Sequence, residues 1–294
     1  MLTNIKSKFI IQKVFQLLGK SRSLKIAHRN NFLNNKLEIT VNNYKEAYEI
    51  IEINLRLSDN PDDYPEKENP FINLRTNENA DKFQIYFNDE TLVKNVYSIS
   101  KDKINVKNIT IKIPPEIKSF RSLFEYCTCI REIHINNWVR KDITDLSYMF
   151  YGCKELRKIY IARLKSDNVT DMSHMFCECS SLKEIDVSSF NTQNVKDMEK
   201  MFGECTALEK LDLSNFKTNN VINMAEMFFS DTTLQSLNVK NFDIINVQYL
   251  DKMFYNCKNL INLLLFDNNA KEIKDKSDMF YGCDYVKKED KDKF

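Results

Sequence analysis

Cysteine is the residue type with the richest chemistry in this chain, because a thiol can form a disulfide, bind zinc or act as a nucleophile. Six of the eight cysteines recur in one register, and Asp231 takes one place in that series. The six are Cys127, Cys153, Cys179, Cys205, Cys257 and Cys283. A small, polarisable side chain in one recurring position is typical of a packed core. A disulfide also needs Cα atoms within roughly 7 Å, closer than neighbouring helices of a repeat array. We therefore predict buried, reduced thiols.

The other reactive groups do not form a site in the sequence. The pairs Cys127-x-Cys129 and Cys177-x-Cys179 lack the spacing of a zinc site. His28, His134 and His174 fall in different predicted elements, with no Ser, Cys or carboxylate at a catalytic spacing. The sequence contains no glycine-rich phosphate loop and no nucleophile motif. We expect no metal, no cofactor and no enzymatic activity.

The repeat is marked by the pair Met-Phe, which returns every 26 residues. The pairs begin at Met149, Met175, Met201, Met227, Met253 and Met279, with Leu123-Phe124 one step earlier. A fixed period between 20 and 50 residues is the mark of a solenoid, in which each unit buries its apolar side against its neighbours. The composition, with 43% hydrophobic residues and only 4 Gly and 5 Pro, suits such a core.

The segment around each Met-Phe pair has the periodicity of a helix. Its apolar residues would occupy an arc of about 120° on a helical wheel. In one unit these are Val195, Met198, Met201, Phe202 and Cys205. Asn168 and Asn194 each precede an Asp by three residues, a spacing that resembles a helix capping box. We expect one helix in each unit.

A second segment of each unit alternates with period two, which predicts a short strand. Examples are Ile185-Asp186-Val187 and Leu211-Asp212-Leu213. Upstream, Ile109–Ile113 followed by two prolines predicts the first strand of the array, and Phe83–Phe87 predicts a strand of an N-terminal cap. The expected fold class is α/β, a curved solenoid with short parallel strands on its concave side and helices on the other face.

The run MFGECTALEKLDLSNFKTNNVINM, Met201 to Met224, resembles the BspA-like leucine-rich repeat of mycoplasma surface proteins and protist proteins. The blocks Met-Phe-x-x-Cys, Leu-x-x-Leu-x-Leu-Ser and Asn-Val-x-x-Met recur in register over about 170 residues. The resemblance implies a leucine-rich-repeat-like solenoid. Bacterial members look like secreted adhesins, whereas this chain carries no recognisable export signal.

The outward residues of the predicted strands would line the concave face, where solenoids bind their targets. We expect a protein partner on this surface, because acids and bases are balanced and the clustered Lys and Arg that nucleic acid requires are missing. The predicted binding residues are Glu132, His134, Asn136, Lys158, Tyr160, Glu184, Asp186, Ser188, Lys210, Asp212, Ser214, Ser236, Asn238 and Lys240, followed by Asn262, Leu264 and Phe266 at the end of the array. The alternative is a solvated sheet in which Asp and Ser satisfy neighbouring backbone.

Residues 1–58 read as a small helical module. Its first predicted helix carries an apolar face made of Ile10, Ile11, Val14, Phe15 and Leu18. Together with a second helical pattern it resembles an F-box, which implies docking to a Skp-type adaptor of a cullin ligase. Residues 1–37 contain eight Lys or Arg and no acid, a composition that could touch an anionic membrane. We do not expect membrane contact, because the apolar face would be needed for the core of the module.

We thus expect a helical module at 1–58, a linker and cap at 59–108 and a solenoid at 109–294. No apolar run approaches the roughly 20 residues of a spanning helix, so that the cytoplasm is the expected location. The predicted function is a non-catalytic interaction scaffold, with a substrate-recognition adaptor of a ubiquitin ligase as its finer form. A cell-surface adhesin is the alternative.

Overall fold

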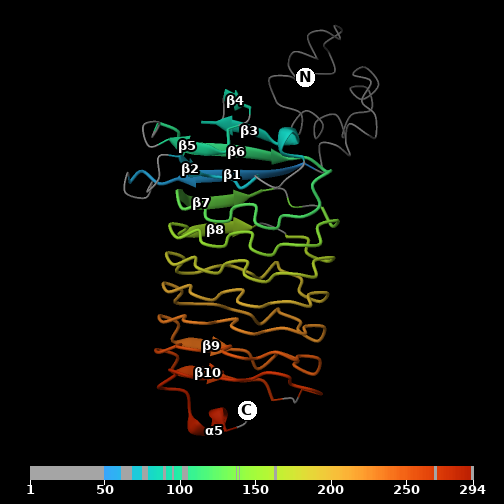
Figure 1. Ribbon diagram of the computed structural model, residues 1–294, viewed down its shortest axis with the longest axis vertical. Coiled ribbons are helices and arrows are strands. Elements are labelled where there is room, and N and C mark those ends of the chain that lie inside the picture. Colours follow the sequence, from blue (N-terminus) through green and yellow to red (C-terminus); the bar gives the residue numbers. More distant parts are fainter. Residues whose placement is uncertain are drawn as a thin grey trace, which may run out of the picture.

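The computed structural model describes residues 50–292, apart from 61–67, 75–78, 89–90, 95, 101–104, 137, 139, 162–163 and 268–269. Strands and stacked loops make up nearly all of it (Figure 1). The strands are β1 (Ile51–Leu57), β2 (Glu68–Pro70), β3 (Gln84–Phe87), β4 (Thr91–Val93), β5 (Ser98–Ser100), β6 (Asn108–Ile113), β7 (Ile130–Ile135), β8 (Lys158–Ile161), β9 (Ser236–Asn238) and β10 (Asn262–Leu264). The described helical segments are the 3-10 turn η3 (Ala80–Lys82) and α5 (Lys288–Lys291).

A six-stranded sheet in the order β4-β3-β6-β1-β7-β8 begins the fold. Strand β1 alternates apolar and polar residues and buries Ile51, Ile53 and Leu55, as a sheet with one covered face requires. The predicted strands at 83–87 and 109–113 are present as β3 and β6. However, β6 pairs antiparallel with β1 and β3, and β1 lies between β6 and β7. The parallel array therefore starts at the pair β7–β8, and not at β6 as expected.

The expected helical N-terminal module is wrong where the structure describes it, because residues 51–57 are the central strand β1. Residues 1–49, which carry Ile10, Ile11, Val14, Phe15 and Leu18, lie outside the described residues. Part of the expected linker is also a strand, since β2 pairs antiparallel with β5. Within the described part of the chain, no helix is long and apolar enough to cross a lipid bilayer.

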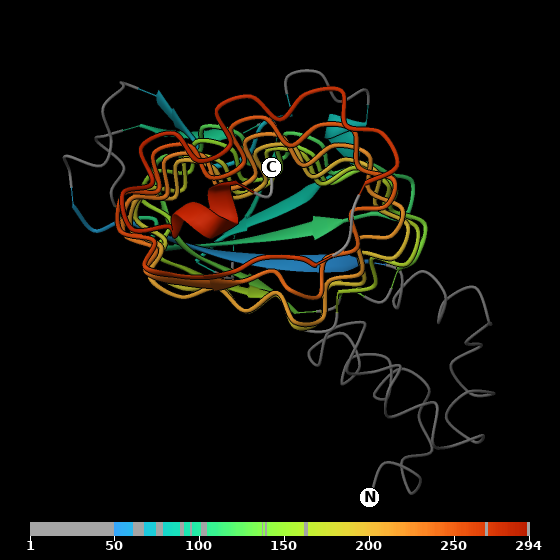
Figure 2. The same cartoon turned by 90° about the horizontal axis from the view of Figure 1, so that it is seen from below.

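The 26-residue units stack as coils of one column, with β7 and β8 near one end and β9 and β10 near the other (Figure 1). Seen along the column, successive coils superpose closely (Figure 2). The column is therefore nearly straight, and the side that was expected to be concave is close to flat.

The prediction of helices on the second face is wrong. That face consists of consecutive turns whose backbone N–H groups alternate between two kinds of partner. Leu146, Tyr148 and Phe150 donate to carbonyls of the next coil, at 2.9 to 3.0 Å. Met149 and Tyr151 donate three residues back, to Leu146 and Tyr148, at 3.1 to 3.2 Å. A helix would need bonds four residues back, and the bonds between coils take its place.

The turns depend on residues with positive φ, a conformation that costs a non-glycine residue about 1 to 2 kcal/mol. One such residue precedes each Met and another follows each Phe by two positions, as Lys200 (φ 52°) and Glu204 (φ 61°) do around Met201-Phe202. Each turn gains hydrogen bonds to the neighbouring coil, worth about 1 kcal/mol apiece. Those bonds offset the backbone strain.

The expected capping boxes are also absent. Asn168 donates its side-chain N–H to the carbonyl of Lys141 at 2.8 Å, and Asn194 donates to that of Asp167 at 2.6 Å. Asp171 accepts from the backbone N–H of Ser173, two residues ahead, at 2.9 Å. These side chains join coils and close turns, which explains their recurrence without a helix.

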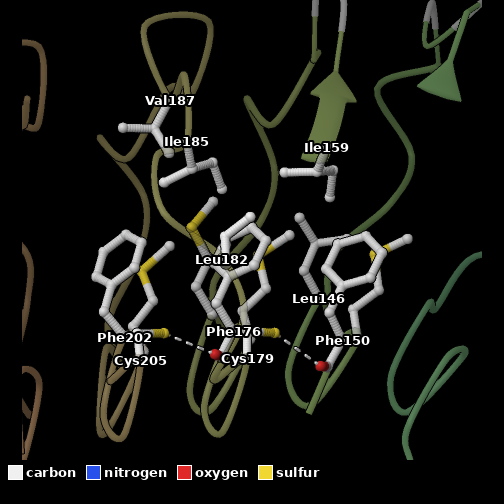
Figure 3. Close-up of a cluster of buried hydrophobic side chains, with 14 of the residues drawn as sticks. Leu146, Phe150, Ile159, Phe176, Cys179, Leu182, Ile185, Val187, Phe202 and Cys205 are labelled. Atoms are coloured by element: carbon white, nitrogen blue, oxygen red, sulfur yellow. Dashed lines mark hydrogen bonds between the residues drawn. The ribbon is translucent and has the colours of Figure 1, made fainter. Parts of the chain in front are cut away.

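The core of the column is a stack of phenylalanine rings, one from each coil (Figure 3). Ring centroids of neighbouring coils lie 5.4 to 6.0 Å apart from Phe124 to Phe280, with nearly parallel planes. The predicted inward residues Val195, Met198, Met201 and Phe202 are fully buried. The periodicity therefore predicted the inward face correctly, although the backbone that presents it is not helical.

Candidate functional site

The exposed side of the sheet is the candidate site, and we call it the ladder face. It consists of the outward side chains of β3, β6, β1, β7 and β8, continued by the equivalent positions of the later coils. Strand register aligns Tyr86, Thr110, Asn54, His134 and Tyr160 in one row across five strands. The 26-residue repeat extends this row to Asp186, Asp212, Asn238 and Leu264.

The structure places the predicted binding residues on this face as expected. Glu132 and His134 are half-buried, and the other twelve are exposed: Asn136, Lys158, Tyr160, Glu184, Asp186, Ser188, Lys210, Asp212, Ser214, Ser236, Asn238 and Lys240. At the end of the array Leu264 is exposed, whereas Phe266 is only 1% exposed and belongs to the core. Its binding role is therefore excluded.

A stacked pair of rings stands near the middle of the face. The rings of His134 and Tyr160 lie 4.4 Å apart at an interplanar angle of 24°. Tyr160 is 48% exposed. An exposed aromatic face next to polar groups is the kind of surface that partners bind most strongly.

A second row carries charges of alternating sign. It runs from Arg56 to Glu132 and Lys158 by strand register, and to Glu184 and Lys210 by the repeat. Arg56 and Glu132 form an ion pair at 3.9 Å, and the backbones of Glu184 and Lys210 form a bridge. Positive and negative side chains therefore alternate along this row, and no stretch of it carries charge of a single sign.

Strands β1, β3 and β6 contribute residues to the face that the sequence reasoning missed. They include Glu52, Asn54, Arg56, Tyr86 and Lys112. The sequence IEINLRL (Ile51–Leu57) alternates apolar and polar residues with the period of a strand, and this pattern could have predicted β1.

Two acids of the ladder face have a structural task. Asp186 and Asp212 each accept a hydrogen bond from the backbone N–H two residues ahead, on Ser188 and Ser214, at 2.9 Å. Hydrogen bonds from these serines lower the pKa of both carboxyl groups. For these two acids the alternative interpretation is therefore correct, because their carboxylates bond to backbone N–H groups nearby.

The family model described as "Mycoplasma protein of unknown function, DUF285" matches residues 118–212 and again residues 186–294, together more than half of the chain. The chain belongs to the DUF285 family. This confirms the predicted BspA-like leucine-rich-repeat family. The F-box-like segment lies outside both matches.

Solved structures similar to this DUF285 chain are leucine-rich repeat proteins. One, from T. pallidum, has a TM-score of 0.41 and 20% identity, and the match covers 60% of this chain and 73% of that one. Another, from Bacteroides ovatus ATCC 8483, has a TM-score of 0.34 and 19% identity, and the match covers 52% of this chain and 41% of that one. No curated protein matches the chain.

The cysteines of the DUF285 repeat lie in its core, as predicted. Cys179 and Cys205 donate their thiol hydrogens to the carbonyls of Phe150 and Phe176 in the preceding coil, at 3.3 and 3.1 Å (Figure 3). Burial raises the pKa of both thiols well above its usual value. A thiol held protonated is a poor nucleophile and a poor metal ligand.

The distance argument against disulfides is wrong, because hydrogen-bonded coils lie about 4.8 Å apart and not at the spacing of packed helices. The thiols of the recurring cysteines from Cys153 to Cys283 instead donate to carbonyls of the preceding coil. All eight cysteines are free in the structure. Their reduced state in the cell stays a prediction, and intact-mass measurement under non-reducing, denaturing conditions should find eight free thiols. Several bridges in protein from the native host would contradict it.

One further cluster of the DUF285 chain gathers metal-type ligands. Cys177, Glu178 and Glu204 bring one ligand atom each within 4.8 Å of the others. The ammonium group of Lys200 lies 2.8 Å from Glu204 and 3.6 Å from Glu226. The ammonium group of Lys154 lies 3.5 Å from Glu178, so that both carboxylates of the cluster already have a positively charged partner.

Proposed function

We propose that the chain binds another protein through the ladder face and has no catalytic role. The observation that carries the proposal is the continuity of this face from β3 to the last coil. Nine rows of side chains at about 4.8 Å spacing make a surface about 40 Å long. At a width of about 20 Å it matches the roughly 800 Å² that each partner contributes to a standard protein interface. The predicted residues of the repeat occupy six of these nine rows and would cover about two thirds of that area.

The charge pattern supports a protein partner over nucleic acid. Phosphate binding requires clustered Lys and Arg, whereas the row from Arg56 to Lys210 alternates in sign. Such a pattern gives specificity for a surface of complementary charges. The stacked rings of His134 and Tyr160 supply an amphipathic contact of the type enriched in interfaces.

A combined variant of Lys158→Glu, Tyr160→Ala and Lys210→Glu tests the proposal. We expect it to reduce capture of the partner from host lysate by at least about 100-fold, since central aromatic contacts contribute about 2 kcal/mol or more and reversed charges oppose binding. These three side chains are exposed. Asp186 and Asp212 are unsuitable, because their replacement would break turns.

Lys196→Glu is the matched control, because Lys196 is exposed but lies outside the strand rows of the ladder face. It should leave capture unchanged. Equal capture by the combined variant and the wild type, with equal thermal unfolding midpoints, would refute the role of the ladder face.

The location and the finer role are part of the proposal. An intracellular adaptor of a ubiquitin ligase should fractionate with the cytosol and recover a Skp-type adaptor and a cullin. A cell-surface adhesin should be accessible to protease on intact cells. Fractionation of the native host separates these two roles and leaves the test of the ladder face unaffected.

A further inference from the structure

A pocket of about 630 Å³ opens on the ladder face over β3, β6, β1 and β7. This volume lies in the range of small-molecule sites. Polar side chains and aromatic rings line it, among them Tyr86, Thr110, Asn54, His134, Arg56 and Glu132. The pocket is therefore too polar for an apolar ligand.

Strand register gives the pocket a floor and two walls. Thr110 and Asn54 lie side by side on β6 and β1, flanked by Tyr86 on β3 and His134 on β7. The two rings stand three strand spacings apart, about 14 Å. Tyr160 stacks against His134 from the neighbouring strand β8. The result is a trough with small polar residues between aromatic walls.

Three of the four Lys, Arg and Glu side chains that line the trough already have a contact. Arg56 pairs with Glu132 at 3.9 Å, and the Lys112 ammonium lies 4.8 Å from the centre of the Tyr86 ring. A ligand with a strong charge of one sign would have to displace these contacts. The lining thus favours a neutral ligand.

The floor offers directional hydrogen bonds. The Asn54 side-chain oxygen accepts from the Thr110 hydroxyl at 2.7 Å. This bond occupies the amide oxygen and leaves the two hydrogens of the amide nitrogen for a ligand acceptor. The carboxylates of Glu52 and Glu132 are acceptors for ligand hydroxyl groups.

We propose that this pocket binds a neutral saccharide of one or two rings. A sugar hydroxyl donates and accepts at once, which suits an amide next to carboxylates. The C–H face of a sugar ring packs on an aromatic wall such as His134, while its hydroxyls reach the floor. The site is independent of the proposed protein partner, because a free sugar needs only the pocket and not the length of the ladder face.

The test uses the full chain and a panel of methyl glycosides of glucose, galactose, mannose and N-acetylglucosamine with their common disaccharides. Saturation-transfer NMR and calorimetry at up to about 10 mM cover the weak affinities expected for ligands of this size. We expect at least one member to bind. Asn54→Asp keeps the side-chain shape but removes the amide donors, and His134→Ala removes one wall. Each should weaken binding at least tenfold.

Lys210→Ala changes the same face outside the pocket and should bind the sugar as the wild type does. Thermal unfolding midpoints establish that the variants are folded, and a folded Asn54→Asp suffices if His134→Ala is unstable. The proposal is overturned if no glycoside binds, or if Asn54→Asp binds as the wild type does. Loss of sugar binding with normal protein capture, or the reverse, separates this site from the proposed function.

Discussion

Replacing Phe202 by Ala is expected to lower the free energy of unfolding by about 3 to 5 kcal/mol, the range for a deleted core aromatic. Phe202 is fully buried and lies between Phe176 and Phe228, with ring centroids at 5.7 and 6.0 Å. The coils on either side are tied to it by backbone hydrogen bonds, so that they cannot collapse into the cavity. Urea denaturation measures the loss as a shift of the transition midpoint at an unchanged slope.

Phe280 is the matched control, since it holds the same position in the last coil. It is half-buried, and among the described residues it stacks on Phe254 alone, at 5.5 Å. With one neighbour missing and part of the ring in water, Phe280→Ala should cost about 1 to 2 kcal/mol. Equal, small losses for both variants would contradict the continuous ring stack.

Replacing Asp231 by Cys is expected to stabilise the protein by about 1 to 3 kcal/mol at neutral pH. This is the range of free energy lost when a buried polar atom has no hydrogen-bond partner. Asp231 occupies the register at which the neighbouring coils have Cys205 and Cys257. One carboxyl oxygen accepts from the Cys205 backbone N–H at 2.9 Å, and the other is buried without a partner among the described residues. A thiol there could donate to the Phe202 carbonyl, as Cys205 and Cys257 donate to the carbonyls of Phe176 and Phe228.

The effect should depend on pH. Burial raises the pKa of the Asp231 carboxyl well above its ordinary value, so that the folded state retains a proton that the unfolded chain releases. Because the folded state binds more protons, this group makes stability fall as pH rises above the unfolded pKa of about 3.9. The loss continues up to the raised pKa of the folded state.

Denaturation of the wild type and Asp231→Cys between pH 4 and pH 8 measures this difference. The gap in unfolding free energy should widen as pH rises, because the other titrating groups are common to both proteins. A gap that is constant with pH, or a variant that is less stable at neutral pH, would contradict the account of Asp231.

The inward face of the repeat could be predicted from the sequence because burial depends only on which residues recur. Met201, Phe202 and Cys205 return at fixed register and lie in the core. The helix prediction failed because spacings of three and four residues also arise in consecutive turns. Gly152, Asn256 and Gly282 stand in the positive-φ position of three coils and were a usable signal, since glycine and asparagine favour that conformation. The other coils have Tyr126, Glu178, Glu204 and Ser230 there.

The candidate site was predictable only in the repeat. Its outward residues follow from alternation, whereas the pairing of β1 between β6 and β7 joins segments more than 50 residues apart. No local pattern specifies that pairing. The trough between Tyr86 and His134 exists only because of it, so that residues such as Asn54 could not be assigned to a site beforehand.

The direct test of the ladder face as a protein-binding surface is lysine footprinting of the chain with and without its captured partner. Lys158 and Lys210 lie on the face, and Lys196 lies outside its strand rows. The account predicts that binding slows acylation of Lys158 and Lys210 at least several-fold and leaves the rate at Lys196 unchanged. Protection of Lys196 with full reactivity at Lys158 and Lys210 would place the partner elsewhere and contradict it.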